Sequence, residues 1–161
     1  MWTVRDLLSD KTQQQELLAI LQTFDIRLRR HPSHTDIPAS YWGSPEAGIE
    51  GDTVHVRDDT PAHSLLHEAC HLICMGSRRR ATVVRDAGGE DKEEAAVCYL
   101  QLCLAHRLSP LTWQLLAMDM DDWGYSFPTG STGKWFLHDA DDARDWLVQN
   151  GFSAWLIQEE T

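Results

Sequence analysis

Two histidines four residues apart, with a glutamate directly after the first, could hold a metal ion. They form the run His-Glu-Ala-Cys-His at residues 67–71. On a helix, side chains with this spacing project from one face about one turn apart, so both imidazoles could reach one ion at about 2 Å. Glu68 would point beside the ion, where its carboxylate could take a proton from an attacking water. The pattern predicts His67 and His71 as metal ligands and Glu68 as a catalytic base; the alternative is two helix-surface histidines that bind nothing.

A zinc site for hydrolysis needs a third protein ligand and one open position for water. We favour Glu94, because Cys98 follows it at helical spacing and the small Ala95 would allow another helix to approach closely. Three other acids and two histidines are alternatives for this third position: Glu90, Asp91, Glu93, His106 and His138. We expect one zinc ion per chain, although two histidines and a glutamate also suit iron.

Hydrophobic periodicity predicts the elements that must position these side chains. The motif falls in an expected helix over 62–75, with Pro61 in its first turn, Asp59 or Thr60 as its cap and Gly76 as its end. Directly before it, 47–50 and 53–57 flank Gly51-Asp52, a pair typical of a tight hairpin turn. Glu94 falls in a second long helix, expected over 90–106.

Capping residues and proline predict three further helices, over 11–22, over 110–120 and from Asp139 or Asp141 to 148. Alternation of apolar and polar residues predicts a strand over 24–31, and residues 124–134 are expected to form a loop. Together these segments predict an α+β fold. A small, mostly antiparallel sheet should pack on the motif helix and on the glutamate-bearing helix, followed by a helical C-terminal part. The 161 residues are the usual size of one domain, so we expect a single domain over 1–161.

The composition restricts partners and location. The net charge of −11 disfavours binding to a phosphate backbone, and the arginine run 78–80 is expected to be solvated surface charge. No apolar run is long enough to cross a bilayer, so we expect no membrane insertion. The first eleven residues show no basic segment followed by an apolar one, so we expect no secretory signal and a cytoplasmic location.

Residues 45–105 resemble a known group of enzymes. The motif at 67–71 with Glu94-Ala95 on a following helix resembles the gluzincin branch of the zincin metallopeptidases, and is similar to the small ImmA/IrrE-like zinc peptidases. The resemblance implies a zincin-like fold, zinc bound by His67, His71 and Glu94, and Glu68 as the base. It also implies a hydrolase that cleaves peptide bonds, with a peptide or protein as substrate.

Two further expectations concern the substrate. Zincins commonly bind a peptide along an edge strand, and the strand at 53–57 could be that edge. A hydrogen-bond donor should assist the oxyanion, and four residues are candidates: Arg85, Tyr99, Tyr125 and His138. Two other functions stay open: a non-catalytic metal-binding module that binds a protein partner, and a metal hydrolase that acts on a non-peptide bond.

Overall fold

A computed structural model describes residues 1–158, apart from the side chain of Ser77. The described chain is α+β, with eight α-helices and one mixed three-stranded sheet, as the sequence predicts at the level of fold class. It divides into two compact units, residues 1–88 and residues 89–161, while a single domain stays a prediction. None of the helices between residues 1 and 158 has the length and apolar character required to cross a membrane.

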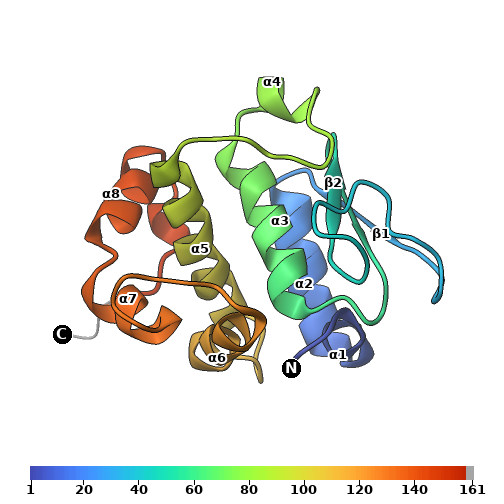
Figure 1. Cartoon of the computed structure of the whole chain (residues 1–161), viewed down its shortest axis with the longest axis horizontal. Helices are drawn as coiled ribbons and strands as arrows, with labels where there is room; N and C mark the ends of the chain where they lie inside the picture. The colour runs from blue at the N-terminus through green and yellow to red at the C-terminus, as the bar shows by residue number, and fades with distance from the viewer. Residues whose placement is uncertain (159–161) are drawn as a thin grey trace. The chain divides into compact units, whose positions relative to one another are not determined.

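The first unit contains the sheet and the motif helix (Figure 1). Its elements, in chain order, are α1 (Val4–Ser9), α2 (Lys11–Thr23), β1 (Arg27–Arg30), β2 (Gly48–Glu50), β3 (Thr53–Val56), α3 (Ala62–Cys74) and α4 (Ser77–Arg80). Helix α2 is confirmed, with Asp10 as its cap accepting a hydrogen bond from the Gln13 amide at 2.8 Å. Sequence analysis missed α1, although Thr3 and Asp6 form a capping box that signals its start.

The sheet corrects the expected strand arrangement. The β2–β3 hairpin is confirmed, but the strand order is β1-β3-β2, and β1 runs parallel to β3. With one parallel and one antiparallel pair, the sheet is mixed and not mostly antiparallel. The tight turn at Gly51-Asp52 forces β2 and β3 to be antiparallel, whereas the long connection over 31–47 leaves the direction of β1 to tertiary packing.

Helix α3 packs against β2 and β3 and forms much of the core of the first unit. The expected cap was wrong: Pro61 occupies the cap position, and the Thr60 hydroxyl accepts from the Arg57 amide at 2.9 Å instead. The Ala62 amide at the helix start donates to the Trp2 carbonyl at 2.8 Å. The N-terminal segment therefore satisfies a group that a capping side chain would otherwise serve.

The arginine run 78–80 is only partly solvated. Arg80 is buried, with its Nε donating to the Leu72 carbonyl at 2.7 Å and its Nη1 donating to the Phe24 carbonyl at 2.8 Å. These two carbonyls lie near the ends of α3 and α2, where helices leave carbonyls without intrahelical donors. The surface-charge prediction is wrong for Arg80, which ties the two helix ends together.

The second unit is helical. Its elements are α5 (Asp91–His106), α6 (Trp113–Trp123), α7 (Thr132–His138), α8 (Asp141–Gln149) and a 3₁₀ turn at Ser153–Trp155. Helix α5 packs against α6, α8 and the 3₁₀ turn. Helix α6 begins three residues later than expected, because Thr112 caps it by accepting from the Leu115 amide. Helix α7 begins inside the expected loop, because Ser131 caps it in the same way.

At Gly48, where β2 begins, the backbone of the preceding loop lies very close to the strand. A Cβ at residue 48 would lie 2.6 Å from backbone atoms of both Ala39 and Ser40. We expect Gly48→Ala to lower the free energy of unfolding by about 2–3 kcal/mol, because backbone has to move. Urea unfolding followed by circular dichroism measures this. Gly76→Ala, whose Cβ meets no atom within 4 Å, is the control; equal stability of both variants would contradict the expectation.

Candidate metal centre

The two motif histidines already have the separation of two ligands on one ion. Their Nε2 atoms lie 3.2 Å apart, and their rings are nearly perpendicular, at 87°. Two nitrogens at about 2.0–2.1 Å from a tetrahedral zinc would be about 3.3 Å apart. The separation of these two nitrogens is therefore compatible with a shared metal ion.

Burial distinguishes the members of the motif. Within α3, His67 and Cys74 are half-buried, and every other residue is buried. His71 is 6% exposed and Glu68 is 8% exposed, low values for such polar side chains. A helix that is buried nearly all round belongs to a core, so His67 is the member of the pair that solvent reaches more easily.

Glu68 lies on the flank of α3 that faces the segment leading into β2. One turn earlier on this flank, the Ser64 hydroxyl accepts a hydrogen bond from the Ala47 amide at 2.9 Å. Side chains four residues apart share a helix face, so Glu68 follows Ser64 toward β2. Because Glu68 directly follows His67, its side chain leaves α3 roughly 100° around the helix from that imidazole.

A third histidine on α3 was missed by sequence analysis. His63 precedes His67 by one turn and is 1% exposed. Burial, and secondarily the nearby charge of His67, lower the pKa of His63 to about 4. The signal was available, since 63, 67 and 71 repeat at the same spacing along one helix stripe. His63 is neutral at pH 7 and forms the buried end of this stripe.

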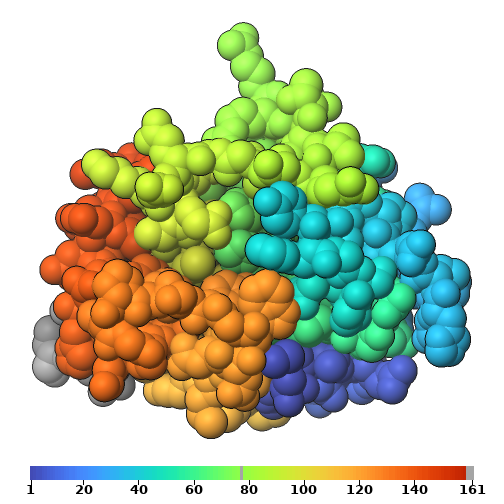
Figure 2. Space-filling view, in the orientation of Figure 1, coloured from blue at the N-terminus to red at the C-terminus, as the bar shows by residue number. Residues whose placement is uncertain are grey.

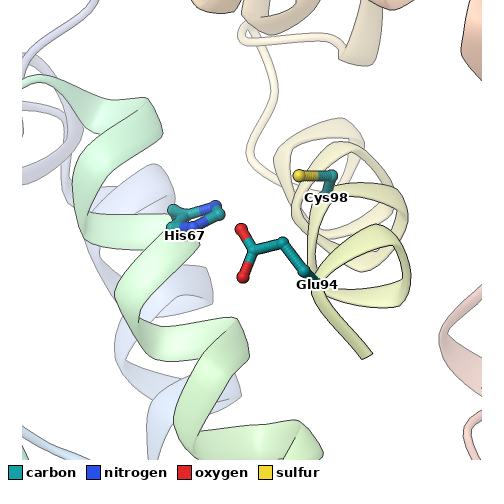
Figure 3. Close-up of side chains that lie close together, drawn as sticks. All are labelled: His67, Glu94 and Cys98. Carbon is teal, nitrogen blue, oxygen red and sulfur yellow. The ribbon is translucent and has the colours of Figure 1, made fainter. Parts of the chain in front are cut away.

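Helix α5 carries the predicted third ligand. Glu94 is exposed in the first turn of α5, and Cys98 follows one turn later. Figure 3 shows these two side chains on the same side of α5, with His67 on α3. Cys98 is therefore a second potential donor on this face.

The alternative residues for the third metal ligand lie in other surroundings than Glu94. Glu90 occupies the cap position of α5, and Glu93 is 8% exposed on a different side of the helix from Glu94. His106 lies at the far end of α5, where its Nδ1 accepts from the Trp113 amide at 3.2 Å. His138 is exposed at the end of α7. Asp91 is exposed in the first turn of α5 with Glu94, whereas Glu93 leaves this turn in another direction.

The two tyrosines among the candidate oxyanion donors lie in different surroundings. The Tyr99 hydroxyl accepts from Arg144 Nη1 at 2.8 Å, and this tyrosine is buried. The Tyr125 hydroxyl accepts from the buried Gln101 amide nitrogen at 3.4 Å, and its ring lines a cavity together with Glu94. Tyr125 is therefore the candidate that shares a surface with the predicted third ligand.

The peptide-binding edge predicted at 53–57 is wrong. Strand β3 is central, with β1 on one side and β2 on the other, so it has no free edge. The outer edge of β2 is itself paired, since the Gly51 amide donates to the Val83 carbonyl at 3.0 Å and the Arg85 amide donates to the Ile49 carbonyl at 2.8 Å. Arg85, another candidate oxyanion donor, thus has its backbone engaged in covering this edge.

Comparison of the chain with protein-family models, with curated proteins and with solved structures gives no match. The zincin resemblance, the zinc ion and the peptidase activity stay predictions at this point.

The buried His63 leads to a pH prediction for the metal-free protein. Its pKa is about 4 in the folded chain against about 6.5 in the unfolded chain, so the unfolded chain binds the proton first as the pH falls. Above pH 6.5 both states are neutral; between pH 6.5 and 4 we expect a loss on the order of 3 kcal/mol of stability from this group.

Urea unfolding of chelator-treated protein at a series of pH values tests this loss. His63→Gln should flatten the dependence on pH between 6.5 and 4, whereas His138→Gln, at an exposed position, should leave it unchanged. Identical slopes for His63→Gln and the original protein would show that His63 takes up its proton in the folded state.

Proposed function

We propose that the chain is a zinc-dependent metallopeptidase. In this proposal His67, His71 and Glu94 bind one zinc ion, and Glu68 activates the water that attacks the peptide bond. The observation that carries the proposal is the imidazole pair of α3, whose Nε2 atoms are 3.2 Å apart with a buried glutamate between them in sequence. This combination of donors and base is the one that metal-assisted hydrolysis requires.

The chemistry of the donor set supports zinc. Neutral imidazole nitrogens and a carboxylate oxygen are ligands that zinc accepts in catalytic sites, where three protein ligands leave one position open. The neutral state of His63 at pH 7 adds no positive charge beside His67. A cation bound at this end of α3 therefore meets no repulsion from that imidazole.

We choose the third ligand from the positions and burial of the side chains on α5. Glu94 projects from the first turn, and Ala95, next to it, has the smallest side chain that still favours a helix. Cys98 lies on the same side one turn further along and is the competing donor, because a thiolate is also a zinc ligand (Figure 3). We assign Glu94 because the carboxylate is exposed in the first turn while Cys98 is 6% exposed.

The mechanism follows from the proposed roles. A bound zinc ion would lower the pKa of a coordinated water to about 7 and polarise the scissile carbonyl. Glu68 accepts the proton of the attacking water and then delivers it to the leaving amine. The Tyr125 hydroxyl is the candidate to donate a hydrogen bond to the oxyanion, since its ring shares a cavity wall with Glu94.

Metal content is the first test. We expect about one zinc per chain in untagged protein measured by elemental analysis, and loss of at least about 90% of it in His67→Ala, His71→Ala and Glu94→Ala. Glu90→Ala is the matched control, because it removes a carboxylate from the start of the same helix. Cys98→Ser distinguishes the two donors on the Glu94 face and should keep the metal.

Two outcomes would revise or reject this assignment. Zinc lost in the histidine variants and in Cys98→Ser, but kept in Glu94→Ala, would make Cys98 the third ligand. No metal in any preparation, even after zinc is supplied, would reject the hydrolase and leave the motif as part of the core of α3.

The role of Glu68 is tested separately from metal binding. Glu68→Gln should keep the zinc and reduce peptide cleavage by at least about 100-fold, because an amide has no basic oxygen to accept the proton. Mass spectrometry of a peptide mixture incubated with each protein measures cleavage. Glu50→Gln, an exposed carboxylate on β2, is the control. Equal cleavage by Glu68→Gln and the original protein would exclude Glu68 as the base. If the original protein cleaved esters but no peptides, it would be a hydrolase of a non-peptide bond.

A further inference from the structure

Strand β1 lies at one edge of the sheet, and in the described chain β3 is its only strand neighbour (Figure 1). The Arg27 amide donates to the Asp52 carbonyl at 2.8 Å, on the β3 side. Because successive residues of a strand direct their backbone groups to opposite edges, Leu28 and Arg30 direct theirs to the outer edge. Each of these two residues offers one backbone donor and one backbone acceptor to a further strand.

Both ends of this open edge are defined. Before β1, the Ile26 amide donates to the Leu21 carbonyl of α2 at 2.9 Å, so this amide is already satisfied. After β1, the next residue that faces outward is Pro32, which has no amide hydrogen. Between Ile26 and Pro32 the open edge therefore has the backbone groups of Leu28 and Arg30, which suit a short added strand.

The connection that follows β1 covers other parts of the sheet. Arg57 Nη1, at the end of β3, donates to the Thr35 carbonyl at 2.9 Å, and Ser40 pairs with Gly48 at the start of β2. Figure 2 shows the light-blue segment that follows β1 at the molecular surface. This connection therefore runs from the end of β1 toward β2, and among residues 1–158 no strand covers the outer edge of β1.

Apolar side chains line one side of this edge. A cavity of about 430 Å³ is formed by the end of α2 and the start of β1, with Leu18, Leu21 and Leu28 in its lining. Leu18 is 42% exposed and Leu28 is half-buried, so burial of their surface would stabilise a bound strand. Two carboxylate residues, Asp25 and Asp52, also line the cavity, so a neutral apolar side chain suits it better than an acidic one.

Arginine side chains occupy the other face of β1. Side chains alternate along a strand, so Arg27 and Arg29 leave the face opposite to Leu28. Both arginines are exposed, and neither forms an ion pair within the described chain, whereas Arg30 is paired with Asp58 at 2.7 Å. They form a local basic group in a chain of net charge −11. Opposite charges on neighbouring strands stabilise each other, so acidic side chains suit this face.

A second copy of the chain is a poor occupant of this edge. Pairing of two β1 strands would bring the arginines of one copy next to those of the other. Like charges directly opposite each other on neighbouring strands are destabilising, and basic side chains on an open edge oppose self-association in this way. The charge pattern therefore favours an acidic strand from another protein over a second β1.

We propose that the outer edge of β1 binds an extended segment of a partner protein in which apolar and acidic residues alternate. The segment adds a strand to the sheet through the backbone groups of Leu28 and Arg30. Its apolar side chains cover Leu18 and Leu28, and its carboxylates face Arg27 and Arg29. The binding surface lies within the first unit and does not depend on the proposed metal centre.

A blocked peptide with this alternation tests the binding surface. The full chain is treated with a chelator and titrated with acetyl-Glu-Val-Glu-Val-Glu-Val-amide, and nuclear magnetic resonance follows binding. Acetyl-Lys-Val-Lys-Val-Lys-Val-amide controls for charge, and acetyl-Glu-Glu-Glu-Val-Val-Val-amide controls for alternation. We expect the first peptide to bind at least about tenfold more tightly than either control, although the net charge of the chain attracts the lysine peptide. Equal affinities, or tightest binding of the lysine peptide, would overturn the proposal.

Amide hydrogen exchange shows whether the bound peptide adds a strand. At saturation, the Leu28 and Arg30 amides should exchange at least about tenfold more slowly, because each would donate to the added strand. The Arg27 amide already donates to the Asp52 carbonyl, so its exchange should change less. Peptide binding without slower exchange at Leu28 and Arg30 would overturn the proposal.

Two variants alter the charge and the apolar surface separately. The double variant Arg27→Glu with Arg29→Glu should weaken binding of the acidic peptide at least about tenfold, and Leu18→Gln should weaken it at least about threefold. Arg78→Glu, at an exposed position of α4, is the control with the same change of charge and should bind as the original chain does. Circular dichroism checks that each variant is folded. Unchanged binding by the folded double variant would overturn the proposal.

Analytical ultracentrifugation distinguishes an acidic partner from a second copy of the chain. We expect the acidic peptide to leave the number of chains per particle unchanged, because the peptide and a second copy do not compete for β1. A dimer of the original chain that the peptide dissociates would assign the open edge to a second copy and overturn the proposal.

Discussion

Helix α3 has to fill the core of the first unit and still present imidazoles on one stripe, and the 3.6-residue period of the helix makes both possible. Leu65 and Leu72 are fully buried, while His67 on another side of the helix is half-buried. Backbone groups at both ends of the helix are hydrogen-bonded, the Ala62 amide to the Trp2 carbonyl and the Leu72 carbonyl to the Arg80 side chain. These contacts fix the position from which each imidazole leaves the helix.

Burial of polar side chains on α3 costs desolvation free energy, which other interactions must offset. An imidazole and a carboxylate removed from water are stable only with hydrogen bonds, charge balance or a metal ion. His63 shows one solution, because burial keeps it neutral at pH 7. A neutral imidazole is also the form that binds metals.

The second unit joins two features in one short helix segment. The first turn of α5 presents Glu94, and Ala95 beside it contributes to an apolar cavity whose opposite wall is the stacked pair Phe127 and Trp135. The loop that carries Phe127 is tied to Asp121 through Thr132, so the cavity walls are kept by local hydrogen bonds.

Local rules determined the elements of this protein, and tertiary structure decided their surroundings. The motif helix, the hairpin at Gly51-Asp52 and the helix that bears Glu94 follow from periodicity and turn residues, which depend on neighbours within a few positions. Other features depend on residues far apart in the chain: β3 as the central strand, Val83 covering the edge of β2, and Arg80 buried between two helix ends. No local pattern encodes them, because a backbone group is satisfied by whichever partner the packed chain brings to it.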